Sequence, residues 1–252
     1  RVLEESKPNY IFHLAASASV ADSVQNPSND FNRNNFGTAR LLEAVRLWGG
    51  DCRIVLASSG AVYGEPSNLP IRETDPLNPI SPYGANKAST EMNARAYAHS
   101  YGLDIVTARL FNTYGPRMVR FVLLDFIRKL QKNADRLEVL GTGQQVRDFS
   151  YVDDVCEGLL LLGDAGESGE AYHVASGHSV TVQELAERLI KQLGLHSRLV
   201  FTGTSWAGDA QQWVVDIEKI RGLGYAPQVD LDEGIAQTVA WFEKGFGPIN
   251  RK

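Results

Sequence analysis

Three side chains in the first third of the chain have the types and spacing needed to move a proton at an alcohol carbon. Tyr83 and Lys87, in the segment SPYGANK (81–87), are four residues apart, which puts them on one face of a helix. A tyrosine with its ordinary pKa near 10 is a poor base at neutral pH, but an ammonium one turn away favours the phenolate and lowers that pKa. Ser59 lies 24 residues upstream and offers a hydroxyl to hold the substrate oxygen. The pattern therefore predicts Tyr83 as a general base assisted by Lys87 and Ser59.

The same residues have an ordinary structural interpretation. Tyr83 and Lys87 could be an exposed pair on the surface of a helix. Ser58 and Ser59 could be hydroxyls that accept hydrogen bonds from loop amides at the end of a strand. The spacing of these residues leaves both interpretations open.

The segments around these residues alternate between strand and helix patterns. The apolar runs are continuous rather than alternating, which predicts a parallel sheet covered on both faces. Because ligands gather at the carboxyl ends of such strands, the segments HLAAS (13–17), LASSG (56–60) and LFNTYG (110–115) should meet along one rim. The expected strands are 9–16, 52–59, 104–112 and 171–177, with two short strands around a glycine turn in the segment LEVLGTGQQVRDFSYVDDV (137–155). The expected helices are 31–49, 83–101, about 117–132, 181–194 and about 231–244, with a further helix from Asp153.

The composition describes a chain with one substantial core and room for a smaller lobe. It has 252 residues, 43% of them apolar, and 25 basic against 30 acidic residues. This mild acidity gives no electrostatic reason to expect a nucleic-acid or anionic-membrane partner. The two cysteines, Cys52 and Cys156, have no metal-ligand spacing and are expected to be small buried side chains in a reducing, cytoplasmic setting. No apolar run is long enough to span a bilayer.

Six blocks stand in order along the chain: HLAA (13–16), NNFGT (34–38), SSGAVYG (58–64), SPYGANK (81–87), RLFNTYGPR (109–117) and RDFSYVDDV (147–155). With these blocks, the chain resembles the extended short-chain dehydrogenase/reductases, specifically the nucleotide-sugar epimerase and dehydratase group. The resemblance implies an α/β fold with a Rossmann-type, doubly wound parallel sheet that binds NAD, expected over 1–115 and 148–177. It also implies a smaller α/β lobe for a nucleotide-diphosphate sugar, expected over 116–147 and 178–252.

The resemblance also implies roles for individual residues. Ser59, Tyr83 and Lys87 match the catalytic hydroxyl, base and lysine, and Tyr83 and Lys87 would also contact the cofactor. The other positions that match cofactor contacts are Leu14, Ala15, Ala16, Asn34 and Phe111. The positions that match substrate contacts are Ser59, Asn112, Arg147 and Asp209. Each cofactor position could equally be plain packing, which is the better interpretation for the apolar members taken singly. Arg147 could instead form a surface ion pair with Asp148 or Asp153.

The reaction class follows from what stands after Ser59. Dehydratases and decarboxylating relatives carry acids there, whereas this chain has Gly60 and Ala61. Without those carboxylates, elimination of water lacks its acid and base. The resemblance therefore implies an NAD-dependent 4-epimerase, expected to act on UDP-glucose or UDP-galactose without a metal. A 4-keto sugar reductase and a non-catalytic binding module remain as alternatives.

The sequence departs from the family pattern in two places and matches it at the helices used for dimer formation. The late block WAGD (206–209) keeps Asp209 but has Trp206 where many 4-epimerases have an arginine for the diphosphate. No glycine-rich turn for the cofactor pyrophosphate precedes residue 9, so about 50 to 60 residues of the family pattern are expected to be missing. The helices at 31–49 and 83–101 correspond to the pair that forms homodimers in the family, with Leu41, Leu42 and Trp48 as candidate contacts or as sheet-facing core.

Overall fold

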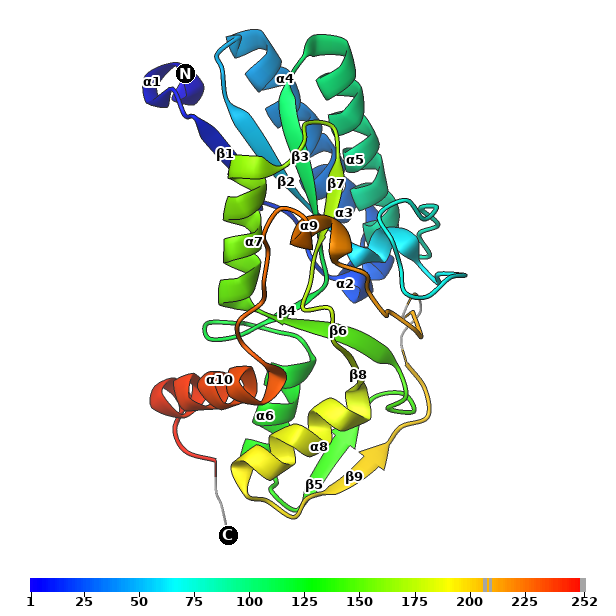
Figure 1. The fold of residues 1–252 in the computed structure, drawn as a ribbon. Coiled ribbons are helices and arrows are strands. Elements are labelled where there is room, and N and C mark those ends of the chain that lie inside the picture. The colour runs from blue at the N-terminus through cyan, green and yellow to red at the C-terminus, as the bar shows by residue number, and fades with distance from the viewer. Residues whose placement is uncertain (206–207, 209, 250–252) are drawn as a thin grey trace.

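A four-stranded parallel sheet forms the upper half of the molecule. The computed structural model describes residues 1–205, 208 and 210–249. The sheet has the order β1-β2-β3-β7, and every neighbouring pair is parallel. Figure 1 shows it above a smaller lobe. Its strands are β1 (Tyr10–His13), β2 (Arg53–Ser59), β3 (Asp104–Leu110) and β7 (Ala171–Val174).

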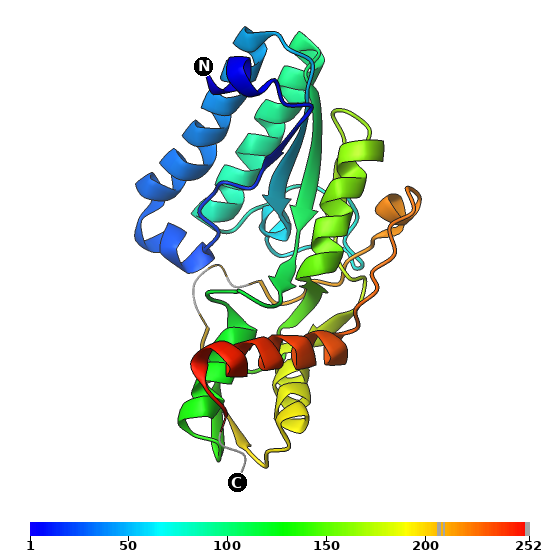
Figure 2. The same cartoon turned by 90° about the vertical axis from the view of Figure 1, so that its left-hand side faces the viewer.

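Helices cover both faces of this sheet, as the continuous apolar runs predicted. Figure 2 shows α4 (Gly37–Trp48) and α5 (Pro82–Tyr101) on one side and α7 (Val152–Ala165) on the other. The centres of β2 and β3 are therefore buried on both faces. The remaining elements of this half are α1 (Val2–Ser6), α2 (Val20–Gln25), α3 (Pro27–Phe31), the π-helical turn η1 (Asn32–Phe36), the 3₁₀ turn η2 (Gly60–Tyr63) and α9 (Glu218–Arg221).

The lower lobe is built from short strands and three amphipathic helices around a separate apolar cluster. Its strands form one sheet of order β4-β6-β8 and a parallel pair β5-β9. The cluster joins residues from Tyr114 to Ile249. The lobe contains β4 (Asn112–Tyr114), α6 (Val122–Lys132), β5 (Arg136–Val139), β6 (Val146–Tyr151), β8 (Ser179–Thr181), α8 (Val182–Leu193), β9 (Arg198–Phe201) and α10 (Leu231–Phe246).

Helix boundaries follow the capping residues in the sequence. Ser81 caps α5 by accepting from the amide of Gly84, with Pro82 at the first helical position. Thr181 accepts from the amide of Glu184 at the start of α8, which is one of the two hydrogen bonds of a capping box. Gly102 and Gly194 end their helices with positive φ angles of 68° and 65°.

Two strand segments contradict the expected division of the chain between the lobes. Val215, assigned by sequence to the lower lobe, pairs with Ile71, and Ile217, Ile220 and Tyr225 pack in the apolar cluster of the upper sheet. Conversely β6, assigned largely to the upper domain, pairs with β4 and β8 in the lower lobe. Strand pairing and side-chain burial decide both cases, and neither is local to the sequence. The other boundaries remain predictions.

Candidate active site

Ser59 ends β2 at the carboxyl edge of the sheet, where its hydroxyl has two partners. Its Oγ accepts from the amide of Ala61 at 3.2 Å and so caps the η2 turn. The same side chain is hydrogen-bonded to the side chain of Tyr83. The structure therefore brings the predicted hydroxyl and the predicted base together, and Ser59 also satisfies a loop amide as the structural interpretation supposed. Ser59 pairs with Leu110 in parallel register, while His13, the last residue of β1, pairs with Leu56, so the three strands run out at the same edge of the sheet.

The N-terminal turn of α5 places Tyr83 against η2. Gly84 permits this approach, because a Cβ at that position would lie 2.4 Å from the carbonyl oxygen of Ala61. The amide of Tyr83 donates to Ser23 Oγ at 3.1 Å. Tyr83 is buried, not the exposed helix residue of the alternative interpretation. Its ring is thus fixed by the helix, by the turn and by α2.

The pKa of Tyr83 corrects one expectation. Burial raises it above the ordinary value of tyrosine; the bond from Ser59 and the charge of Arg120 oppose the shift, and Asp30 adds to it. The sequence predicted a lowered pKa caused by Lys87. The lysine is instead buried with its Nζ donating to the carbonyl of Ala57 at 2.8 Å, and the cation that acts on the phenol is Arg120. Desolvation of the phenolate outweighs that charge in the ligand-free chain.

Lys87 is itself perturbed. Burial lowers its pKa to about 8, against the charges of Asp30 and Glu91, which raise it. The pKa of His13 is lowered mainly by burial and further by the charge of the Lys87 ammonium. His13 Nε2 lies 3.0 Å from the hydroxyl of Thr38. Strongly perturbed titratable groups at the carboxyl edge of a parallel sheet are typical of an active site.

The residues expected to contact the cofactor fall into two groups. Leu14 and Ala15 are exposed and Ala16 is half-buried where β1 ends, as a wall beside a bound group should be. Asn34 accepts from the amide of Ser17 at 3.0 Å, while its Nδ2 is buried without a partner among the described residues. An orphaned donor beside an exposed apolar wall fits the ribose and ring of a nicotinamide nucleotide.

Phe111 lies farther from such a role. It is 8% exposed and packs edge-on against His173 and Trp213, with ring centroids 5.3 and 6.0 Å apart. Its ring also fills the space beside Gly60. Phe111 is therefore part of the core that supports the rim, and a cofactor contact remains a prediction.

The predicted substrate residues lie at the junction of the two lobes. Asn112 begins β4, and its Oδ1 is buried without a hydrogen-bond partner in the part of the chain described. Arg147, on β6, is 7% exposed rather than at the surface; it donates to the carbonyls of Val146 and Ala210. Its guanidinium also lies over the ring of Trp213 at 5.0 Å. Asp209 and Trp206 lie outside the described residues.

A buried polar network that the sequence analysis missed adjoins the site. Arg109 on β3 pairs with Glu91 on α5 at 2.7 Å, and both side chains are 7% exposed. Ser58 donates to the same carboxylate, and Arg109 Nη1 donates to Tyr63, whose hydroxyl lies 2.5 Å from His173 Nε2. A charged residue inside an otherwise apolar strand was the available signal, because buried arginines need a partner.

Gly60 has no room for a side chain. A Cβ there would lie 2.5 Å from Phe111 Cε1, inside the contact distance of any real Cβ. Ala61 is also buried, at 6% exposure. Neither position after Ser59 therefore presents a carboxylate to the site. In the described parts of the chain, no group of three or more His, Cys, Asp and Glu side chains is arranged to hold a metal.

A Gly60→Ala substitution is expected to destabilise the protein by about 1–3 kcal/mol, because the added methyl forces the buried ring of Phe111 to move. Urea denaturation measures the effect. Gly245→Ala is the matched control: it lies in α10 with open space around its Cβ position, and alanine there should be neutral or slightly stabilising. Equal stabilities for the two variants would show that position 60 accommodates a side chain.

The two cysteines differ in their exposure. Cys52 is buried as expected, but Cys156 is exposed on α7. No helix in the described ranges combines the length and the apolar character needed to cross a membrane.

Comparison with known proteins places the chain among sugar-nucleotide enzymes. The family model described as GDP-mannose 4,6 dehydratase matches residues 1–238. A dTDP-glucose 4,6-dehydratase of Actinoplanes sp. is 37% identical over 234 residues, covering 92% of this chain and 72% of the relative. A UDP-glucose 4-epimerase of Thermotoga maritima, solved with UDP-glucose, superposes with a TM-score of 0.90 at 36% identity, covering 97% of this chain and 80% of that one.

A second solved epimerase was determined with a dinucleotide. The UDP-glucose 4-epimerase of Thermus thermophilus, in complex with NAD, has a TM-score of 0.88 at 33% identity and covers 97% of this chain and 81% of that one. Family match, identity and superposition extend over both lobes. The chain belongs to the GDP-mannose 4,6 dehydratase family, which comprises NAD-dependent sugar-nucleotide epimerases and dehydratases of the extended short-chain dehydrogenase/reductase fold.

Proposed function

We propose that this protein is an NAD-dependent nucleotide-sugar 4-epimerase that interconverts UDP-glucose and UDP-galactose. The observation that carries the proposal is a hydrogen-bonded Ser59–Tyr83 pair at the sheet rim with no carboxylate at positions 60 and 61. Proton transfer at one carbinol carbon needs only the pair, whereas elimination of water needs a further acid and base. The steric limit at Gly60 supports this choice within a family that contains both activities.

The chain's own residues supply the proton chemistry. Tyr83 takes the proton of the sugar 4-hydroxyl, while the Ser59 hydroxyl holds the same oxygen. The hydrogen bond from Ser59 and the charge of Arg120 favour the tyrosinate, against the effect of burial. The chemistry that NAD would supply when bound is that of a reversible hydride acceptor for carbon 4. Leu14, Ala15, Ala16, Asn34 and Lys87 are the residues that would hold its nicotinamide half.

The diphosphate would be held at the junction of the lobes. The amide Nδ2 of Asn112 would be its donor to a diphosphate oxygen, since Oδ1 can only accept. The planar guanidinium of Arg147 suits phosphate oxygens. Asp209 is proposed as a further substrate contact on the resemblance alone. Tethering at the diphosphate leaves the sugar free to turn, so that hydride returns to its opposite face.

The proposal is tested by incubating the purified protein with UDP-galactose and catalytic NAD. We expect UDP-glucose to form without net reduction of the cofactor. NMR of the anomeric protons measures the formation of UDP-glucose, and absorbance at the NADH band measures reduction of the cofactor. Loss of water to a 4-keto-6-deoxy sugar would contradict it and would identify a dehydratase. Turnover that requires and consumes a reduced cofactor in proportion to product would instead identify the 4-keto sugar reductase, the second candidate from the sequence.

A non-catalytic binding module is distinguished by calorimetry. Titration with NAD and with UDP should show binding of each ligand if the site works as proposed. A pure scaffold would bind neither, although Ser59, Tyr83 and Lys87 are assembled. Because the tyrosine and lysine are buried and perturbed rather than exposed, the structure favours an enzyme.

We also propose a cytoplasmic homodimer formed through α4 and α5. Leu42 is buried in the sheet-facing core, whereas Leu41 and Trp48 pack against that core and stay half-buried. The exposed apolar side chains on these helices are Leu47, Met92 and Tyr101, with Phe36 at the end of η1. Light scattering coupled to size-exclusion chromatography should give a particle mass of twice the 27.7 kDa chain mass. In Met92→Glu, the measured particle mass should fall toward that of a single chain.

A further inference from the structure

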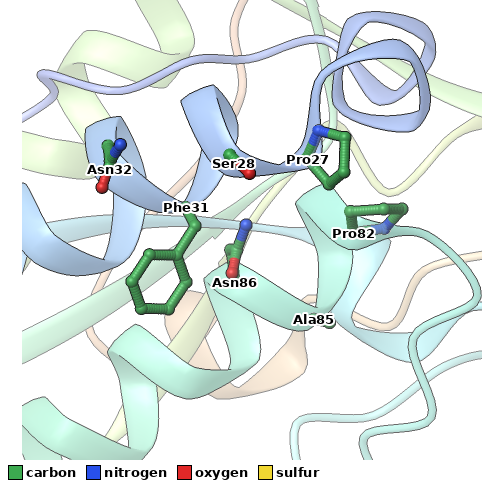
Figure 3. Close-up of a pocket in the computed structure, with 7 residues that line it drawn as sticks. All are labelled: Pro27, Ser28, Phe31, Asn32, Pro82, Ala85 and Asn86. Carbon is green, nitrogen blue, oxygen red and sulfur yellow. The ribbon is translucent and has the colours of Figure 1, made fainter.

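The N-terminal half of α5 is clamped by a short helical hairpin from an earlier part of the chain. Helices α2 and α3 and the turn η1 all contact α5. Ser23, fully buried on α2, accepts the amide hydrogen of Tyr83. Figure 3 shows Asn86 on α5, on the side of that helix that faces Ser28 and Phe31 of α3. The pocket drawn there includes none of Ser59, Tyr83 and Lys87.

Asp30 is the buried charge within this clamp. It is 2% exposed, and its Oδ2 accepts from Asn86 Nδ2 at 2.7 Å. Asn86 Oδ1 in turn accepts from Asn35 Nδ2 at 2.9 Å. The other oxygen of Asp30 is buried and has no partner among the residues described. A buried acceptor without a partner destabilises the fold, so packing alone does not account for a carboxylate here.

The position of Asn86 links this charge to the predicted catalytic pair. Asn86 lies in the turn of α5 between Tyr83 and Lys87. Asp30 is also the leading charge acting on both residues: it raises the pKa of Lys87 against the effect of burial and raises that of Tyr83. The other charges facing the pair are Glu91 and His13 near the lysine and Arg120 near the phenol.

We propose that Asp30 is a positioning residue of the active site, which fixes the Tyr83–Lys87 turn of α5 through Asn86 and keeps Lys87 charged inside the protein. A buried ammonium without a negative neighbour loses its proton readily. Lys87 has Glu91 on its own helix, but Glu91 is already neutralised by Arg109. Of the two carboxylates whose charge acts on Lys87, Asp30 is the one without a cationic partner in the contacts of the described residues. The proposal deepens the proposed epimerase, on which its catalytic part rests.

The test of the charge does not need turnover. In the purified chain, the ionisation of Lys87 is followed by NMR of its Cε or Nζ signal, assigned by its absence in Lys87→Met. Asp30→Asn keeps the size of the side chain and the bond from Asn86 but removes the charge. We expect the midpoint for Lys87 to fall by about one pH unit. Asp30→Ser removes the same charge with a smaller side chain and should give the same shift if Asn impairs folding.

The matched control is Asp154→Asn. Asp154 is also buried, at 6% exposure, but its carboxylate accepts from the amides of Gln228 and Val229 on the far side of the sheet rim. Its substitution should leave the Lys87 midpoint unchanged. A midpoint in folded Asp30→Asn equal to that of the wild type, or an equal shift in Asp154→Asn, would overturn the proposal. Either result is independent of whether the epimerase assignment holds.

Kinetics separate positioning from a general loss of structure. Because Asp30 raises both pKa values, both limbs of the kcat profile should move to lower pH in Asp30→Asn. Asn86→Ser keeps the charge but shortens the link, so it should lower kcat with the alkaline limb in place and KM little changed. A uniform fall in kcat with unmoved limbs in Asp30→Asn would reject the electrostatic role. Absence of epimerase activity in the wild type would reject the proposed function alone.

Discussion

Tyr83→Phe is expected to lower the turnover of UDP-galactose by about 10³-fold while binding of UDP stays near that of the wild type. The substitution removes one hydroxyl, the group that is hydrogen-bonded to Ser59. It leaves in place the buried ring and the hydrogen bond from the backbone amide to Ser23. The loss therefore falls on proton transfer rather than on the fold. Steady-state kinetics measure kcat, and calorimetry with UDP measures binding.

Tyr97→Phe is the matched control for this experiment. Tyr97 lies on the same helix, α5, and its hydroxyl donates to Glu43 at 3.2 Å, away from the sheet rim. Its removal should leave kcat within about twofold of the wild type, since it touches no reacting group. If Tyr83→Phe retained wild-type turnover, or if both variants lost activity equally, Tyr83 would not be the base.

Glu91→Gln is expected to destabilise the fold by about 3–5 kcal/mol, because it removes the counter-charge of a guanidinium in a site with little water. The guanidinium of Arg109 is buried in β3, and two of its nitrogens donate to the Glu91 carboxylate. The substitution leaves that cation uncompensated. The free energy of unfolding, from urea denaturation followed by circular dichroism, measures the loss.

An exposed ion pair provides the comparison. Arg221 and Glu218 are 2.8 Å apart with side-chain exposures of 44% and 73%, so Glu218→Gln should cost no more than about 1 kcal/mol. The double variant Glu91→Leu with Arg109→Met removes both buried charges and should be less destabilising than Glu91→Gln alone. A single variant no more harmful than Glu218→Gln would mean that Arg109 finds another counter-charge or reaches solvent.

Local patterns in the sequence predicted most of the elements that position the site. Helix α5 was expected at 83–101 and occupies Pro82–Tyr101, because Ser81, Pro82 and Gly102 mark its ends by capping chemistry. The strands β2 and β3 were found from continuous apolar runs. Short elements such as β8, β9 and α9 were missed, since a few residues carry too little periodicity and their pairing partners are distant in sequence.

The site divides along the same line. Ser59, Tyr83 and Lys87 could be named in advance because residue types and spacing carry their chemistry. The direction of the pKa shift of Tyr83 could not, because it depends on burial and on Arg120, which reaches the phenol from a loop beyond β4. Asp30 was overlooked for a related reason: an aspartate in a polar helical segment looks like a solvated charge until the fold buries it.

By itself, the sequence determined which residues could act, which strands carry them, and that no acid follows Ser59. These are properties of residue identity and local periodicity, and they are read without knowing what lies opposite. Only the tertiary structure decided that Gly60 has no room for a side chain, that Phe111 and Val215 pack in the core, and that Asp30 is buried with a hydrogen bond from Asn86 of α5. Those features depend on contacts between segments far apart in the chain, where excluded volume and desolvation act.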